Sequence, residues 1–215
     1  MICSECNIKK DYSGFTLVEV LVALFIFSTI SVIAFAGLQS VLRSRQVIED
    51  NVDRMIELRK GMRVLQRDIE QSVARPVRGE FGDLLYSMHG NKEEQILDFT
   101  RTGRLNPAGL KRSHLQRVRY MFSDGALMRG AWNTLDGGSD EQRRDFVLFS
   151  QVSEFSFRFL SSDDKWSDSW PIDSDEEDMR KMALLPKAVE IAITFSDLGE
   201  VKRIFAIAGA QPGSE

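Results

Sequence analysis

The sequence predicts an α+β protein in which one long N-terminal helix packs on a mostly antiparallel β-sheet domain. An apolar run from Phe15 to Leu38 leads into a stripe of apolar residues spaced three and four apart, which is typical of a helix. From residue 77 onward, apolar residues instead alternate with polar ones, which is typical of half-buried strands. One helix followed by many short strands, without an internal repeat, is the pattern of an α+β domain.

The apolar run contains a single carboxylate, Glu19, and its other polar residues are only Ser and Thr. As a helix, its 24 or so residues extend about 36 Å, which is enough to cross a hydrocarbon layer of about 30 Å. A charge at that depth costs on the order of 3 kcal/mol or more. Glu19 is therefore either a functional group, or an ordinary anchor's carboxylate that reaches the membrane surface.

The segment before this run differs from a secretory signal peptide. Lys9 and Lys10 supply positive charge, but the apolar run is too long and no Ala-x-Ala cleavage site follows it. We therefore expect a single membrane span that is retained. Arg43 and Arg45 follow the span as closely as the lysines precede it, so charge alone does not orient it.

The helical pattern continues beyond the span, with charged residues on the remaining positions. Pro76 is the expected stop, so the helix is predicted from Phe15 to about Ala74, with Gly37 and Gly61 as candidate bends. The predicted stripe, which we expect to bury against the sheet, consists of Ile48, Val52, Met55, Leu58, Met62, Leu65, Ile69 and Val73.

Two regions give the clearest strand signals. In one, Phe155, Phe157 and Phe159 alternate with polar residues; in the other, residues 188–208 read as a closing hairpin around the turn SDLGE. Its first strand alternates Val189, Ile191, Ile193 and Phe195 with Ala188, Glu190, Ala192 and Thr194. Weaker strand candidates are QILDFTR, VRYMF, ALMRGAW and FVLFS.

The chain shows no set of residues that indicates catalysis or a cofactor. His89 and His114 have no zinc-ligand spacing, and the cysteines Cys3 and Cys6 have no second ligand pair, so neither a metal site nor a disulfide in the domain is expected. The formal net charge of -4 argues against a nucleic-acid partner. We therefore expect that the protein is not an enzyme and has no cofactor.

Residues 163–178 form an acidic segment with eight carboxylates against one lysine. Clustered carboxylates can bind calcium, but their spacing fits no EF-hand, so a solvated loop is the favoured interpretation. The eight are Asp163, Asp164, Asp168, Asp173, Asp175, Glu176, Glu177 and Asp178.

The stretch KKDYSGFTLVEVLVALFIF resembles the leader of type IV pilins and type II secretion pseudopilins. The resemblance implies that a prepilin peptidase cuts between Gly14 and Phe15 and methylates the new amine of Phe15. It also implies a role for Glu19, which would neutralise the amine of a neighbouring subunit during assembly. Opposite charges attract strongly in a low-dielectric setting, and each is costly when left alone.

Further blocks resemble the J-type minor pseudopilin family, general secretion pathway protein J, and imply a pilin-like fold. They are RTGRLNP, RSHLQRVRY, WNTLD, WSDSWP and LPKAVEIAITFSDLGEVKRIFAI, in that order. This resemblance implies a tip complex with the I-, K- and H-type minor pseudopilins and contact with the major pseudopilin. It also implies priming of pseudopilus assembly, and support for the export of folded proteins across the outer membrane.

The resemblance divides the chain into a cleaved leader (1–14), a transmembrane part of the helix (15–38), a periplasmic part of the helix (39–75) and a periplasmic β-rich domain (76–215). The implied location is the inner membrane, with a single span. Two alternatives remain open from the sequence: a minor pilin of a type IV pilus, which shares the leader but lacks the domain blocks, and a membrane-anchored periplasmic hydrolase.

Overall fold

The computed structural model describes residues 14–104, 106–107, 109, 111–172 and 179–208. The chain divides into two compact units, with the boundary between Arg54 and Met55. One helix, α1 (Leu17–Glu70), contributes to both units. The second unit contains the end of α1 and all of the strands, which confirms the predicted α+β class.

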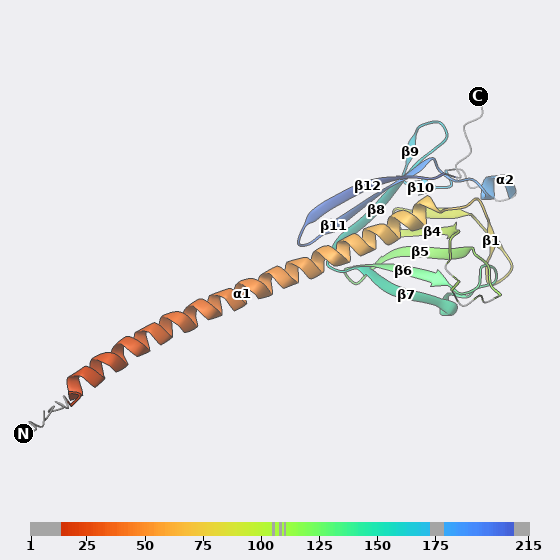
Figure 1. Ribbon diagram of the computed structural model, residues 1–215. Coiled ribbons are helices and arrows are strands. Elements are labelled where there is room, and N and C mark those ends of the chain that lie inside the picture. The colour runs from red at the N-terminus through yellow and green to blue at the C-terminus, as the bar shows by residue number, and fades with distance from the viewer. Residues whose placement is uncertain (1–13, 105, 108, 110, 173–178, 209–215) are drawn as a thin grey trace, which may run out of the picture. The chain divides into compact units, whose positions relative to one another are not determined.

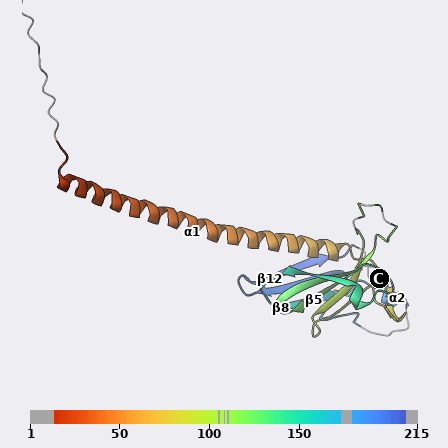
Figure 2. The same cartoon turned by 90° about the horizontal axis from the view of Figure 1, so that it is seen from below.

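The end of α1 provides one wall of the domain core. Leu65 and Ile69 are fully buried there, and Leu58 and Met62 are partly buried against the same cluster. Figures 1 and 2 both show the last turns of α1 lying along the strands. The predicted burial of the whole stripe is wrong at its start, because the side chains of Ile48, Val52 and Met55 are at least half exposed.

The helix ends at Glu70, four residues before the predicted end at Ala74. The chain leaves the helix because the next residues join the strand at 96–101. Ser72 forms a β-bridge with Arg101, and the Val73 N–H donates to the carbonyl of Thr100 at 2.9 Å. Pairing of Ser72 and Val73 with the strand at 96–101, and not Pro76, therefore determines where α1 ends.

Gly61 has a packing role within α1. It is buried, and an added Cβ would overlap the ring of Phe149. The missing side chain lets the helix approach the sheet closely. At Gly37 an added Cβ would meet nothing within 4 Å. The helix continues through both glycines, so neither interrupts it.

The larger sheet has six antiparallel strands in the order β10-β3-β4-β5-β6-β7. All four of the weaker strand candidates are found in it, as β4, β5, β6 and β7. The bounds are β3 Met88–Asn91, β4 Ile96–Arg101, β5 Gln116–Ser123, β6 Ala126–Trp132, β7 Arg143–Phe149 and β10 Ser169–Trp170. A 3-10 turn, η1 (Asp140–Gln142), precedes β7.

The second sheet has four strands in the order β12-β11-β8-β9, and a separate pair, β1 and β2, forms a small hairpin. The bounds are β1 Val77–Arg78, β2 Leu84–Leu85, β8 Val152–Leu160, β9 Trp166–Ser167, β11 Ala188–Phe195 and β12 Gly199–Ala206, and a short helix α2 runs over Met179–Met182. The closing hairpin is confirmed as β11 and β12, which pair from Ala188↔Ala206 to Phe195↔Gly199.

Strand β11 is more buried than its alternating sequence predicted. Ala188, Glu190 and Ala192 are buried as well as the apolar residues between them. The reason is its central position between β8 and β12, where Arg158 stands directly opposite Glu190 and bonds to it at 2.9 Å. The ion pair between Arg158 and Glu190, together with the small side chains of Ala188 and Ala192, therefore leaves this face of β11 buried.

The domain core lies where the two sheets and the end of α1 meet. Phe155, Phe157 and Phe159 of β8 are essentially inaccessible to solvent, as the alternation predicted. The rings of Phe157 and Phe159 lie against Gly90 of β3, where a Cβ would overlap Phe159. The ring of Trp170 of β10 contacts that of Phe159 in a tilted arrangement, with ring centroids 6.1 Å apart. Aromatic contacts therefore join the two sheets.

Candidate functional site

The start of α1 contains the predicted processing and assembly residues. Gly14, Phe15 and Thr16 precede the helix in non-helical backbone, and Gly14 and Phe15 are exposed. The Glu19 N–H donates to Thr16 Oγ1 at 3.3 Å, while Glu19 Oε2 accepts from the Thr16 N–H at 3.5 Å. This reciprocal pair is a capping box, and it stabilises the first turn of the helix.

The role of Thr16 was missed in the sequence analysis, although the T-x-x-E spacing is a known signal for a capping box. Thr16 Oγ1 also lies 3.5 Å from Glu19 Oε2. Within its own chain, Glu19 therefore has hydrogen-bond partners in addition to the predicted amine of a neighbour. The cut after Gly14, the methylation of Phe15 and the assembly role of Glu19 stay predictions.

The apolar part of α1 is long and apolar enough to cross a membrane, judged by length and composition. Its large apolar side chains between Leu17 and Leu42 are all exposed, with exposed fractions of 45% or more. Such a surface needs an apolar environment or apolar partners. The α1 helix is thus consistent with a single-pass membrane anchor.

A buried charged cluster holds the end of α1 against the larger sheet. Asp68 is fully buried and forms ion pairs with Arg101 of β4 and with Arg129 of β6, whose Nε lies 2.5 Å from Asp68 Oδ2. Tyr120 of β5 donates its hydroxyl to the same carboxylate oxygen at 2.9 Å. One side chain of α1 therefore contacts three neighbouring strands.

The environment of this cluster shifts two pKa values upward. Burial raises the pKa of Tyr120 well above its ordinary value, and the Asp68 charge adds to the effect, so the hydroxyl stays a donor. Burial, the largest single cause, would lower the pKa of Arg129, but the Asp68 charge together with Tyr120 and the hydrogen bonds to both raises it. The cluster went unnoticed in the sequence, although a carboxylate between Leu65 and Ile69 on the apolar stripe is a visible signal.

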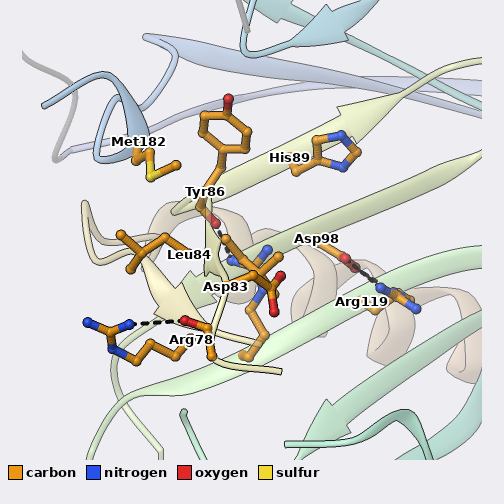
Figure 3. Close-up of a pocket in the computed structure, with 11 residues that line it drawn as sticks. Arg78, Asp83, Leu84, Tyr86, His89, Asp98, Arg119 and Met182 are labelled. Carbon is orange, nitrogen blue, oxygen red and sulfur yellow. Dashed lines mark hydrogen bonds and ion pairs between the residues drawn. The ribbon is translucent and has the colours of Figure 1, made fainter. Parts of the chain in front are cut away.

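On the opposite face of the larger sheet, a cavity of about 740 Å³ opens beneath the β1–β2 hairpin (Figure 3). Figure 3 shows the ion pair between Asp98 and Arg119 on its floor; Arg119 Nε and Nη2 each lie 2.7 Å from a carboxylate oxygen. His89 lies at this cavity and stacks on Tyr86 at 6.5 Å. His114 is exposed.

The acidic segment is only partly described. Asp164 pairs with Lys187 at 2.9 Å, and Asp168 pairs with Lys92 at 3.5 Å. Asp173, Asp175, Glu176, Glu177 and Asp178 lie outside the described residues, as do Cys3 and Cys6. Among the residues that the structure does describe, no group of three His, Cys, Asp or Glu could hold a metal ion.

Comparison with known families gives two matches to the chain. The family described as "Type II secretion system (T2SS), protein J" matches residues 36–207. The family described as "Prokaryotic N-terminal methylation motif" matches residues 9–35, which contain the predicted cleavage site.

Known proteins and solved structures agree with these matches. Type II secretion system protein J of Klebsiella pneumoniae is 30% identical over 91% of this chain and 94% of its own. The protein of the same name from Escherichia coli is 28% identical over 94% of this chain and 100% of its own. A chain of the GspK-GspI-GspJ complex from enterotoxigenic Escherichia coli superposes with a TM-score of 0.62 at 26% identity, covering 74% of this chain and 99% of that one.

Proposed function

Because the chain belongs to the type II secretion system protein J family, we propose that it is a minor pseudopilin of the tip complex that primes pseudopilus assembly. The observation that carries the proposal is the family match over residues 36–207, which covers the second half of α1 and most of the β-rich domain. A minor pilin of a type IV pilus would be expected to resemble this chain only in the leader. The match beyond the leader therefore favours a secretion pseudopilin. The family is a structural one, in line with the expectation that the protein is not an enzyme.

The proposed partners are the I- and K-type minor pseudopilins, with the H-type and the major pseudopilin as further neighbours. Support comes from the similar chain in the GspK-GspI-GspJ complex. We place α1 in the inner membrane through residues 15–38 and the β-rich domain in the periplasm. An exposed apolar helix joined to a domain with its own core suits a subunit that leaves the membrane as a filament grows.

The experiment that tests this function is rescue of secretion. In a bacterium that lacks its own J-type gene but retains the rest of the secretion system, expression of this chain should restore release of a secreted enzyme into the medium. Failure of rescue, with the chain present in the inner membrane at the normal level, would contradict the proposal.

Processing at the N-terminus is a separate proposal. We expect the prepilin peptidase to cut between Gly14 and Phe15 because both residues are exposed and precede the first helical turn, where a protease can reach non-helical backbone. Mass spectrometry of the chain from cells with the peptidase should show an N-methylated Phe15 start. An intact Met1 start in those cells would contradict it, and cells without the peptidase are the control.

A further inference from the structure

The membrane-length part of α1 is followed directly by positive charge. Its exposed apolar side chains continue to Val41 and Leu42, and Arg43 and Arg45 come next. Between residues 15 and 42 the only charged residue is Glu19. The two arginines therefore mark the point at which the surface of this helix changes from apolar to charged.

The length of the helix places these arginines at the level of lipid headgroups. Arg43 lies 24 residues beyond Glu19 in the same helix, which corresponds to about 36 Å along its axis. The hydrocarbon layer of a bilayer is about 30 Å thick, and the bilayer with its headgroup regions is about 40–45 Å thick. When Glu19 lies at one surface of the membrane, Arg43 and Arg45 therefore lie among the headgroups of the other leaflet.

Neither arginine is held firmly within the chain. Both are exposed, and the side chain of Arg43 forms no ion pair or hydrogen bond with any residue that the structure describes. Arg45 Nη2 lies 4.0 Å from Glu49 Oε1, and these two side chains are 70% and 62% exposed. An exposed ion pair at this distance is weak, so both guanidinium groups can bind another anion.

The charges beyond Leu42 are sorted by sign. After the two arginines, the next three charged residues are the carboxylates Glu49, Asp50 and Asp53, about 9–15 Å further along the helix than Arg43. A negatively charged membrane surface attracts arginines and repels carboxylates, and salt screens this repulsion over about 8–10 Å. Positive charge next to the apolar surface and negative charge further away therefore fit an anionic membrane surface at this point.

We propose that Arg43 and Arg45 bind the phosphates of anionic phospholipids in the leaflet through which α1 leaves the membrane. A guanidinium presents a planar fork of donors that matches a phosphate group. Two positions along a helix differ by about 200° around its axis, so the arginines contact lipids on opposite sides of α1. The lipid whose tails surround Leu42 presents its phosphate at the depth of Arg43. These contacts fix the depth of the helix in the bilayer.

The proposal rests on the proposed placement of α1 in the inner membrane, and it adds the class of lipid that the helix binds. Positive residues usually concentrate on the cytoplasmic side of a membrane span. Two arginines at the periplasmic end therefore need a specific partner, and an anionic phospholipid provides one. Failure of the proposal would leave the family and the pseudopilin partners unaffected.

Counting of bound lipids on the full chain tests the proposal. The chain is reconstituted alone into nanodiscs of equal parts phosphatidylcholine and phosphatidylglycerol, and the lipids that it retains in mild detergent are counted by native mass spectrometry. We expect phosphatidylglycerol to be retained at least about threefold over phosphatidylcholine. Equal retention would overturn the proposal. A chain that does not enter nanodiscs would contradict the membrane placement as well, so the two failures are distinguishable.

Substitution of both arginines locates the lipid contact. Arg43→Gln combined with Arg45→Gln should remove at least about half of the preference for phosphatidylglycerol, because two positive charges are lost. Lys9 and Lys10 of the leader contribute equally in every variant, so the difference between variants is the measured quantity. An unchanged preference in this double variant would contradict the assignment.

Two matched variants separate charge at this position from charge elsewhere. Arg43→Lys combined with Arg45→Lys keeps the charge and should keep most of the preference. Arg59→Gln combined with Lys60→Gln removes the same charge from exposed positions 16 residues further along α1, and should change little. A loss in either matched variant as large as that in the Arg43 and Arg45 glutamine variant would overturn the proposal.

Discussion

At the scale of single residues, two carboxylates of α1 show why one was predicted and the other missed. Glu19 was predicted because it is the single carboxylate of an apolar run and part of a short leader motif, and its partner Thr16, which was missed, is only three residues away. Asp68 binds Arg101, Tyr120 and Arg129, which are 33, 52 and 61 residues away. A sequence pattern can identify a local pair, but it cannot identify partners that only the fold brings together.

Replacing Glu19 by Val should leave membrane insertion intact, since it removes a charge from an apolar segment. It should reduce incorporation into the pseudopilin complex, because the amine of a neighbouring subunit loses its partner. The measurement is the amount of the variant that co-purifies with the I-type pseudopilin from detergent extracts.

Thr16→Ala is the matched control, because it removes the capping box and keeps the carboxylate. Loss of a cap costs about 0.5–2 kcal/mol of helix stability. If Thr16→Ala and Glu19→Val reduce co-purification equally, capping explains the effect and charge neutralisation does not. Normal incorporation of Glu19→Val would show that the carboxylate is dispensable.

Asp68→Asn should strongly destabilise the domain, because Arg101 and Arg129 would stay buried without a counter-ion. Removal of one partner from a buried ion pair costs about 3–5 kcal/mol. Glu190→Gln is the control, because its partner Arg158 is 42% exposed and can be hydrated, so we expect a loss of about 1 kcal/mol or less. Urea unfolding followed by tryptophan fluorescence compares the two, and equal losses would contradict the role assigned to Asp68.

At the scale of elements, periodicity predicted the long strands and failed for the short ones. β5, β6, β8 and β11 were expected from their sequences, and all are seven residues or longer. Strands β1, β2, β9 and β10 have two residues each, too few to show a period. The end of α1 was misplaced for a similar reason, since pairing with β4 is a non-local contact.

Gly61→Ala should destabilise the packing of α1 on the sheet. Alanine favours a helix by about 1 kcal/mol over glycine, but overpacking in a core costs about 1–3 kcal/mol. Because the added methyl would overlap the ring of Phe149, we expect the steric cost to exceed the gain. Thermal unfolding of the domain reports the difference.

Gly37→Ala is the control on the same helix, since an added Cβ there meets nothing within 4 Å. It should leave the melting temperature of the domain unchanged. Gly61→Ala combined with Phe149→Leu should recover part of the loss, because the smaller side chain leaves room for the methyl group. A melting temperature for Gly61→Ala at or above that of the parent chain would show that close approach is not required.

At the scale of the whole molecule, the sequence was sufficient for the fold class, the membrane-length segment and the family. These depend on patterns that are local or that repeat along the chain. The cavity beneath the β1–β2 hairpin could not be predicted, because Arg78, Asp98 and Arg117 come from three strands with no shared motif. Sites assembled across strands depend on register, and register is determined by the folded sheet.

Co-purification shows whether this chain is a subunit of a minor pseudopilin complex. The full chain carries an affinity tag at its C-terminus and is expressed with the prepilin peptidase and the I- and K-type pseudopilins of the same secretion system. After detergent extraction of the inner membrane, we expect both partners to be retained with the tagged chain in a fixed ratio. Recovery of the tagged chain alone, while the I- and K-type proteins bind each other normally, would contradict it.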